Sequence, residues 1–433
     1  MDGNGSKPLA LARPLMTLDL LRFTTAGSVD DGKSTLIGRL LYDSKQVFED
    51  QLEHVTEVSR QRGSDEVDLA LLTDGLRAER EQGITIDVAY RYFQTPRRRF
   101  IIADCPGHQQ YTRNMVTGAS TADLAVILLD ARKGVLEQSK RHAFISALLG
   151  IPQIVVAVNK MDLVEYSQER FDDIVGGFAS FLEKLGVADP LHIPISALRG
   201  DNVVDSSERM PWYSGPTLLH HLEEVEVSYD HPYDVPARFP VQWVVRTGGS
   251  DGEYRGYAGQ LASGALRQGE EVIVLPSGQR TRIAAIDTFD GELDEAVAPL
   301  SLTLRLEDDL DVARGELIAG ASDPPTVTRE FEADICWLDS EPLRPGRRYA
   351  IKHTSRTATA VVETLIDRVD VQTLEREAAA QELALNDIGR VMLRTSAPLA
   401  IDPYTRNRRT GSFVLIDERT NHTVGAGMIV ATG

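Results

Sequence analysis

Residues 27–34 (GSVDDGKS) contain the two glycines, the lysine and the hydroxyl residue of a phosphate-binding loop. They follow the apolar run 20–26 and precede apolar residues at helical spacing, so the segment joins a strand to a helix. Glycines allow a tight wrap in which backbone N–H groups and the helix N-terminus face bound phosphate. The candidate nucleotide-binding residues of this loop are Gly27, Ser28, Val29, Asp30, Asp31, Gly32, Lys33, Ser34 and Thr35.

Up to about residue 225, short apolar runs alternate with longer amphipathic segments. This order is typical of βαβ units, and we predict an α/β fold with a mostly parallel sheet. Ligand-binding loops of such sheets lie at the carboxyl ends of the strands, so functional residues are expected just after each apolar run. The predicted strands are residues 20–26, 84–93, 99–104, 124–130, 153–159 and 192–196.

Asp104 ends the third of these runs and begins the sequence Asp-Cys-Pro-Gly-His. We expect Asp104 and Ser34 to hold Mg²⁺, while Lys33 neutralises the charge of the β- and γ-phosphates. Gly107 then senses the γ-phosphate through its N–H and orders the following loop. Without a phosphate loop upstream, an ordinary Pro-Gly turn would explain the segment equally well. The candidate site residues here are Asp104, Cys105, Pro106, Gly107 and His108.

The identity of the nucleotide base is addressed by residues 159–162 (NKMD), at the end of an apolar run. The Asp162 carboxylate can accept hydrogen bonds from guanine N1–H and from the exocyclic amine, a pair of donors that adenine lacks. The sequence Ser-Ala-Leu at 196–198 resembles loops whose backbone N–H supports guanine O6. The predicted ligands are therefore GTP and Mg²⁺, with a base site formed by Asn159, Lys160, Met161, Asp162, Ser196, Ala197 and Leu198.

Two further residues are assigned to hydrolysis. Thr85 is the candidate switch threonine that closes on Mg²⁺ when the γ-phosphate is present, with a plain strand threonine as the alternative. His108 follows the glycine that senses the γ-phosphate and is placed to orient the attacking water, unless it is an ordinary surface histidine. Together with Lys33, these are the predicted catalytic residues. Ser34, Thr85 and Asp104 are the predicted metal ligands.

The length of 433 residues suggests two or three domains. Prolines punctuate residues 228–240, and the short alternating runs with glycine turns that follow are typical of closed β-barrels. Residues 373–383 (TLEREAAAQEL) could instead form a helical insertion or a turn. The predicted domains are an N-terminal tail at 1–20, a GTP-binding domain at 21–228, and all-β barrels at 236–323 and 326–433.

Composition favours a protein of the reducing cytoplasm. Cys105 and Cys336 are the only cysteines, too few for a disulfide framework, and we expect both to pack as small hydrophobic residues. The formal net charge of −19 opposes non-specific adhesion to nucleic acid. No apolar run is long enough to span a bilayer, and the N-terminal apolar patch is too poor for a secretory signal. We therefore expect neither a membrane nor a nucleic-acid partner.

These motifs together resemble the translation-factor-like GTPases related to elongation factor Tu, in which a GTP-binding domain precedes two β-barrels. Members that carry aminoacyl-tRNA typically have histidine at the positions of Ser28 and Asp31, so this chain departs from them. The phosphate loop is instead similar to that of the GTPase-subunit family of bacterial sulfate adenylyltransferase, also called ATP sulfurylase. The resemblance extends over residues 78–93, 101–134, 148–164, 255–264, 272–278, 304–319, 351–360 and 411–429.

The resemblance implies a hetero-oligomer. In that family a small catalytic subunit forms adenylylsulfate and pyrophosphate from ATP and sulfate, for sulfate assimilation and cysteine synthesis, while the large subunit hydrolyses GTP. The transfer is strongly uphill, so hydrolysis can drive it only when switch movements and adenylyl transfer are interlocked. The charged segment 45–81 is a candidate coupling surface, or equally a solvated helical hairpin. Some members carry a C-terminal adenylylsulfate kinase domain, so the chain is either the unfused form or a truncated fusion, and that kinase is a further candidate partner.

Two other functions stay open. One is an RNA-binding factor that delivers aminoacyl-tRNA to ribosomes, and the other is a standalone anion-binding GTPase.

Three lesser signals are interpreted as structural. Residues 247–251 (TGGSD) predict a hairpin loop rather than an ATP site, 406–409 (RNRR) a solvated loop rather than a partner or anion contact, and His220-His221 part of a helix end.

Overall fold

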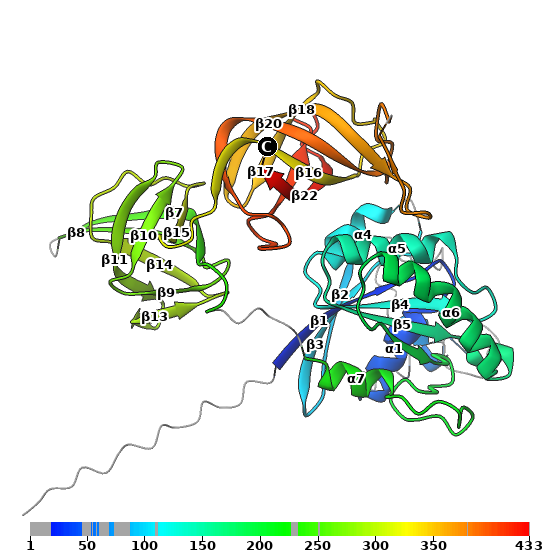
Figure 1. Ribbon diagram of the computed structural model, residues 1–433. Helices are drawn as coiled ribbons and strands as arrows, with labels where there is room; N and C mark the ends of the chain where they lie inside the picture. The colour runs from blue at the N-terminus through cyan, green and yellow to red at the C-terminus, as the bar shows by residue number, and fades with distance from the viewer. Residues whose placement is uncertain are drawn as a thin grey trace, which may run out of the picture. The chain divides into compact units, whose positions relative to one another are not determined.

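The computed structural model describes residues 19–45, 53, 55–57, 59, 69–72, 87–108, 111–226, 233–249, 252–378 and 380–432. The chain divides into two compact units, 1–227 and 228–433 (Figure 1). The first contains both helices and strands, and the second is built from strands. Thr85 and most of the segment 45–81 lie outside the described residues.

A six-stranded sheet forms the centre of the first unit. Its strands are β1 (Asp19–Ala26), β2 (Ala89–Gln94), β3 (Arg98–Asp104), β4 (Leu124–Asp130), β5 (Gln153–Asn159) and β6 (Leu191–Pro194). They lie in the order β2-β3-β1-β4-β5-β6, and β2 alone runs antiparallel to its neighbour. The predicted mostly parallel α/β fold is thus confirmed. The strand expected at 84–93 is wrong at its start, because Asp87 and Val88 precede β2 outside the sheet.

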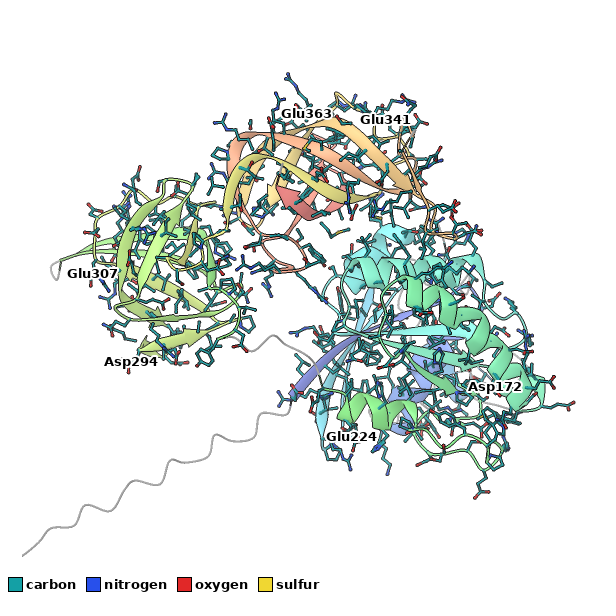
Figure 2. All side chains as sticks on the ribbon, viewed as in Figure 1. Asp172, Glu224, Asp294, Glu307, Glu341 and Glu363 are labelled. Atoms are coloured by element: carbon teal, nitrogen blue, oxygen red, sulfur yellow. The ribbon has the colours of Figure 1, made fainter. Side chains whose placement is uncertain are left out.

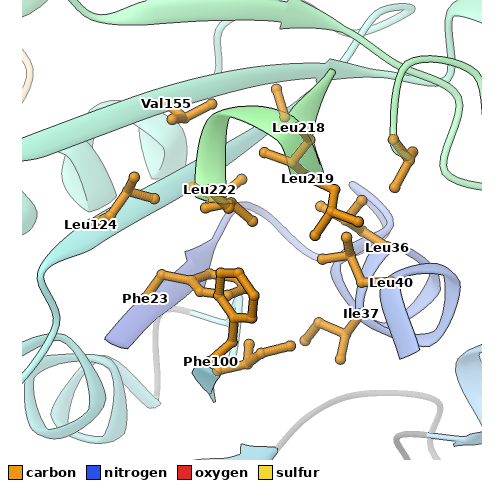
Figure 3. Packing of buried hydrophobic residues seen from close by; sticks show 14 of the residues in the cluster. Phe23, Leu36, Ile37, Leu40, Phe100, Leu124, Val155, Leu218, Leu219 and Leu222 are labelled. Carbon is orange, nitrogen blue, oxygen red and sulfur yellow. The ribbon is translucent and has the colours of Figure 1, made fainter. Parts of the chain in front are cut away.

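Both faces of this sheet are covered. Helices α1 (Lys33–Asp43) and α7 (Leu218–Glu224) pack on one face, where Figure 3 shows their leucines around Phe23 and Phe100. Helices α4 (Thr112–Ala119) and α5 (Glu137–Leu148) contact strands from the opposite side. Because both sides are covered, every residue of β4 is buried, which explains its continuous apolar sequence. Further helical segments within the described residues of this unit include η1 (Leu69–Leu72), η3 (Met161–Val164) and α6 (Gln168–Lys184).

The buried face of α5 agrees only in part with the prediction. Sequence periodicity indicates an apolar stripe of Phe144, Ile145, Leu148 and Leu149, and the helix is present with Ile145 and Leu149 buried. However, the residues buried along it include Ser139, His142 and Ser146, while Phe144 is only half-buried. A pattern of apolar residues at helical spacing cannot identify polar side chains that occupy core positions.

Two closed sheets form the second unit. The first has β7 (Arg238–Gly249), β8 (Gly252–Gln260), β10 (Glu271–Leu275), β11 (Gln279–Thr288), β12 (Gly291–Leu293), β14 (Ser301–Leu306) and β15 (Leu317–Gly320). It follows the order β10-β15-β7-β8-β14-β11-β12 and closes through a β10–β11 pairing, while β9 (Ala265–Arg267) pairs separately with β13 (Glu295–Val297). Closure gives each of the strands β7, β8, β10, β11, β14 and β15 a neighbour on both sides, whereas β12 pairs with β11 alone.

The second barrel is built in the same way. Its strands are β16 (Thr326–Trp337), β17 (Arg348–His353), β18 (Arg356–Val369), β19 (Arg376–Glu377), β20 (Ile388–Ile401), β21 (Ser412–Ile416) and β22 (Thr423–Thr432). They follow the order β17-β21-β22-β16-β20-β18-β19, with a closing β17–β18 pairing. The predicted β-rich second half is therefore confirmed. Within the described part of 373–383 there is a turn and the short strand β19 but no helix, so the alternative of a helical insertion is wrong.

A buried ion pair joins the two barrels. The guanidinium of Arg238, on β7, donates from Nε to Asp402 Oδ2 at 2.8 Å and from Nη2 to Asp402 Oδ1 at 2.9 Å. The exposed fractions of the two side chains are 0% and 1%. Thr410 Oγ1 donates to the same carboxylate at 2.6 Å, so both charges are hydrogen-bonded away from solvent.

The basic run 406–409 also belongs to this contact. Arg406 pairs with Asp323, and Arg409 Nη1 donates to Gln260 Oε1 at 2.7 Å. Residues 402–411 thus reach from the second barrel to the first. Arg406 and Arg409 are exposed, as predicted for a solvated loop, but the contacts that they make were not predicted, because the partners lie about 80 to 150 residues away along the chain, beyond the reach of local pattern.

Smaller expectations are met. β7 and β8 form a hairpin with Gly249 opposite Gly252, as expected for residues 247–251. His220 and His221 lie in the short helix α7, and both cysteines are buried.

Every helix among the described residues is too short or too polar to cross a membrane. Acidic side chains project from each part of the molecule, and Figure 2 labels Asp172, Glu224, Asp294, Glu307, Glu341 and Glu363.

Candidate nucleotide-binding site

The parallel sheet brings the predicted motifs to one edge. Thr25 at the end of β1 lies opposite Asp104 at the end of β3, and Asp130 at the end of β4 lies opposite Asn159 at the end of β5. β1 and β3 finish within one residue of each other, whereas β4 and β5 run three residues further, because Ala26 at the end of β1 pairs with Ile127 and not with Asp130. The loops that leave these strands still lie at the same edge of the sheet. Residues 27–34, 104–108 and 159–162 are gathered by this register.

Backbone conformation shapes the phosphate loop. Gly32 caps the N-terminus of α1 with φ 93° and ψ 28°, a left-handed conformation that favours glycine. A Cβ at Gly32 would lie 2.4 Å from Asn159 Nδ2, so no side chain fits there. Ser34 and Thr35 occupy the first turn of α1, where backbone N–H groups have no partner within the helix. The loop thus presents the open helix N-terminus that anions bind.

Lys33 is held inside the loop. Its Nζ donates to the carbonyl oxygens of Gly27 at 2.9 Å and Ser28 at 2.8 Å. Burial lowers the pKa of Lys33, and the carboxylates of Asp31 and Asp104 act in the opposite direction. The ammonium is therefore aimed into the loop and stabilised by two acidic neighbours.

The segment around Asp104 touches the phosphate loop through Gly107. A Cβ at Gly107 would lie 2.3 Å from Lys33 Nζ and 2.5 Å from the carbonyl oxygen of Gly27. Asp104 is buried where β3 ends, and burial raises the pKa of Cys105 to about 12, which keeps it a neutral thiol. Pro106 is buried as well. Because residues 104–108 and the phosphate loop are in contact, a ligand bound to one segment can change the position of the other.

His108 lies next to Gly107 but points toward the start of α4. Its ring centroid is 5.9 Å from that of Tyr111, with an interplanar angle of 57°, and its side chain is half-buried. His108 therefore follows directly after Gly107, the residue that lies against Lys33 Nζ. Thr85, the third candidate, lies outside the described residues.

Asn159 ties the phosphate loop to the predicted base loop. Its Nδ2 donates to the carbonyl oxygen of Asp31 at 2.8 Å, and its Oδ1 accepts from the N–H of Ala197 at 2.9 Å. One buried amide therefore fixes two segments that lie far apart in the sequence. The N–H of Ala197, one of the backbone donors of the loop expected to support guanine O6, is engaged by Asn159.

Asp162 is oriented by a serine of that same loop. The hydroxyl of the buried Ser196 donates to Asp162 Oδ1 at 2.7 Å. Met161 is fully buried beneath them, whereas Leu198 is 41% exposed. The Asp162 carboxylate, which is expected to bind guanine, is therefore held in place by its hydrogen bond from Ser196 and by the buried Met161 beside it in the chain.

Lys160 connects the base motif with the phosphate loop. Its Nζ lies 3.0 Å from Asp130 Oδ2 and also donates to the carbonyl oxygen of Asp30. Although burial raises the pKa of Asp130, hydrogen bonds from Arg132 and Lys160 outweigh it and hold that pKa well below its usual range. Asp130 therefore stays ionised and keeps Lys160 in place.

Sequence analysis missed two residues that shape the site. Asp130 ends an apolar run, which is the signal that could have identified it. Arg39 lies on α1, where its Nε donates to the carbonyl oxygen of Ala197 at 3.1 Å and its Nη2 to that of Leu198. No local motif marks Arg39, because its partners lie nearly 160 residues further along the chain.

This arrangement fits a guanine nucleotide. Gly32 and Gly107 leave a cradle that a Cβ would fill, Lys33 supplies a positive charge, and Asp162 supplies an oriented acceptor. Among the described residues, no cluster of three or more His, Cys, Asp and Glu side chains could hold a metal ion alone. A hydroxyl at Ser34 and a carboxylate at Asp104 are the hard oxygen donors that Mg²⁺ prefers when phosphate oxygens complete its coordination.

Comparison with known proteins agrees with this geometry. The model of the elongation factor Tu GTP binding domain matches residues 18–229, and that of the GTP-eEF1A C-terminal domain-like family matches residues 330–430. The bifunctional enzyme CysN/CysC of Mycobacterium tuberculosis (strain ATCC 25618 / H37Rv) is 58% identical over 95% of this chain and 67% of its own length.

Two relatives are matched over more of their own length. Sulfate adenylyltransferase subunit 1 of Bacteroides fragilis (strain YCH46) is 52% identical over 95% of this chain and 86% of the relative. Its counterpart in Alteromonas mediterranea is 51% identical over 95% of this chain and 87% of the relative. Identity at this level over nearly the whole chain extends beyond the GTP-binding domain. The chain therefore belongs to the family of sulfate adenylyltransferase subunit 1, and its first unit is a GTP-binding domain of the elongation factor Tu type.

Proposed function

We propose that this protein is the GTP-hydrolysing subunit of a sulfate adenylyltransferase. A small catalytic partner subunit forms adenylylsulfate and pyrophosphate from ATP and sulfate, and GTP hydrolysis on this chain drives that step for sulfate assimilation and cysteine synthesis. The observation that carries the proposal is identity of 51–58% over 95% of the chain to proteins named for this activity, with the phosphate and base loops joined through Asn159.

Residue roles follow from the site. Lys33 and the N-terminus of α1 hold the β- and γ-phosphates, while Asp162, steadied by Ser196, accepts from guanine. Ser34, Asp104 and Thr85 are the residues that would hold Mg²⁺, which neutralises phosphate charge when bound. His108 orients the attacking water beside Gly107.

Three further parts of the proposal rest on sequence pattern. We propose a tail at 1–20, a GTP-binding domain at 21–228, and two barrel domains at 236–323 and 326–433. The protein is cytoplasmic, in keeping with two buried cysteines and no disulfide between them. An adenylylsulfate kinase is a second candidate partner, since one relative is the bifunctional enzyme CysN/CysC.

The decisive experiment combines partner, substrate and nucleotide. The purified chain is mixed with its co-expressed small subunit, ATP and sulfate, with GTP either present or replaced by a non-hydrolysable analogue. We expect adenylylsulfate to accumulate only with the partner and with hydrolysable GTP. GTP hydrolysis without any product would contradict the coupling and favour an aminoacyl-tRNA delivery factor, which a tRNA-binding assay on the GTP form would detect.

A base-specificity variant links that activity to the site. In Asp162→Asn the carboxamide offers one acceptor and one donor, which suits xanthine, with its N1–H and O2, better than guanine. We expect product formation by this variant to depend on XTP rather than GTP. Asp172→Asn, the same change on an exposed residue of α6, is the matched control and should keep GTP dependence. An Asp162→Asn enzyme that still prefers GTP would rule out the proposed role of Asp162.

A further inference from the structure

A carboxylate is buried within the loop that is to bind a polyphosphate. Asp31 is 1% exposed, and its Oδ2 accepts from the backbone N–H of Ser28 at 2.6 Å. The N–H of Asp31 in turn donates to the carbonyl oxygen of Ser28 at 3.3 Å, so the two residues close the loop on each other. Among the described residues, Asp31 Oδ1 is buried without a hydrogen-bond partner.

The electrostatics of this position oppose the ligand. Burial raises the pKa of Asp31 above its ordinary value, and the Lys33 ammonium and the Ser28 N–H, which favour the ionised form, offset only part of that rise. Lys33 is also the group expected to neutralise phosphate, and Asp31 is the foremost carboxylate acting on it. A negative charge held here offsets part of the attraction that Lys33 exerts on phosphate and adds its own repulsion, with little screening by solvent.

The hydrogen bond to Ser28 does not require that charge. An asparagine at position 31 has a similar shape, and its carbonyl oxygen can accept from the same N–H. Backbone conformation is not the reason for an acid either, because Asp31 is absent from the residues with positive φ, unlike Asp30 at φ 67°. The part of Asp31 that asparagine cannot supply is its charge.

We propose that Asp31 is a positioning residue whose negative charge weakens the hold of the loop on nucleotide phosphates and so speeds release of the hydrolysis product. This inference rests on the proposed function, because it concerns the same GTP site. A subunit that turns over once per coupled transfer benefits from such release, since a tightly held GDP would stall the cycle.

Asp31→Asn tests the proposal through binding rather than activity. With a fluorescent GDP analogue, we expect the dissociation rate to fall about tenfold, the scale expected for loss of one poorly screened charge near phosphate. The change in affinity should increase in the order guanosine, GMP, GDP, because charge repulsion grows with the number of phosphates. A merely structural effect on the loop would alter the affinity for all three ligands alike.

Controls separate the possible outcomes. Asp172→Asn makes the same change on an exposed part of α6 and should leave the GDP dissociation rate unaltered. Circular dichroism and thermal unfolding of Asp31→Asn without nucleotide verify that the variant is folded. An unchanged or faster dissociation rate, or an equal change for guanosine and GDP, overturns the role of charge. Failure of the wild-type chain to bind GDP at all would instead refute the proposed function, so the two failures are distinguishable.

Discussion

At the scale of single residues, Gly107 sets how closely two motifs approach. A Cβ there would lie 2.3 Å from Lys33 Nζ, 2.5 Å from the carbonyl oxygen of Gly27 and 2.9 Å from the carbonyl carbon of Ser28. Two of these atoms are backbone, so the overlap cannot be relieved by a side-chain movement. Gly107→Ala is therefore expected to displace the phosphate loop and to weaken GTP binding at least tenfold in a calorimetric titration.

A second glycine supplies the matched control. Gly176 lies on the exposed side of α6, and a Cβ there would meet nothing within 4 Å. Gly176→Ala should leave GTP affinity unchanged and raise stability slightly, because alanine is the better helix former. If both variants bound GTP like the wild type, close packing at Gly107 would be irrelevant to the site.

His142 makes stability depend on pH. Burial, followed by the positive charges of Lys33 and Arg141, lowers its pKa from 6.5 to about 3. Below pH 6.5, the pKa of the histidine in the unfolded chain, the unfolded chain binds a proton at His142 that the folded chain does not bind. The free energy of unfolding therefore falls as the pH drops from 6.5 toward 3, by up to about 1.4 kcal/mol per pH unit. Thermal unfolding of His142→Gln between pH 7 and pH 5 should show a shallower decline than the wild type.

An exposed histidine supplies the control for this slope. His422 is exposed on the second unit, and His422→Gln should retain the wild-type pH dependence. Equal slopes for wild type and His142→Gln would mean that His142 does not contribute to acid sensitivity. Sequence periodicity could not identify this residue, since it recorded only the apolar positions of α5.

At the scale of elements, Arg39 joins α1 to the loop that follows β6. Its guanidinium donates to the carbonyl oxygens of Ala197 and Leu198, and it also lies 3.5 Å from Asp43. In Arg39→Ala the loop loses both donors, so the backbone expected to support guanine O6 should become less ordered. We expect the affinities for GTP and ITP, which share O6, to fall together by about tenfold in competition assays.

The ion pair on the same helix offers a control. Asp43→Asn removes the charge partner of Arg39 but leaves its two hydrogen bonds to the loop. Near-normal GTP affinity in Asp43→Asn, with reduced affinity in Arg39→Ala, would assign the effect to the loop contacts. The opposite pattern would assign it to the ion pair.

At the scale of the second unit, the pair Arg238–Asp402 connects the two barrels. Asp402→Ala leaves a guanidinium with 0% exposure without its carboxylate, and such a loss costs about 3–5 kcal/mol. We expect urea unfolding of the variant, followed by tryptophan fluorescence, to shift to a markedly lower midpoint. Arg238→Met combined with Asp402→Leu should recover part of that loss, because no charge then stays buried.

An exposed pair provides the contrast. Arg267 and Glu295 are 2.8 Å apart with side chains 64% and 32% exposed, so solvent screens their attraction. Glu295→Gln should leave the unfolding midpoint where it is. If Asp402→Ala also left the unfolding midpoint unchanged, the buried pair would not stabilise the contact between the barrels.

The sequence alone determined the class of the fold and supplied the candidate residues of the site. Phosphate-loop, Asp104 and NKMD motifs are short, and each depends on neighbours along the chain, so their residue types and order are readable directly. Strands β1 and β3 to β6 follow from apolar runs, and the barrels follow from closely spaced strands and turns. These are local properties that periodicity records.

Only the tertiary structure decided how those parts are held. Asn159 reaches Asp31 across 128 residues, Arg39 reaches Ala197 across 158, and Arg238 reaches Asp402 across 164. None of these contacts has a local signature, because a hydrogen bond depends on where two segments lie in space and not on the spacing within either one. The parallel sheet gathers the segments of the first two pairs at one edge, and contact between the two barrels buries the third. For this reason the sequence predicts candidate residues of the site, whereas the fold determines which of them position one another.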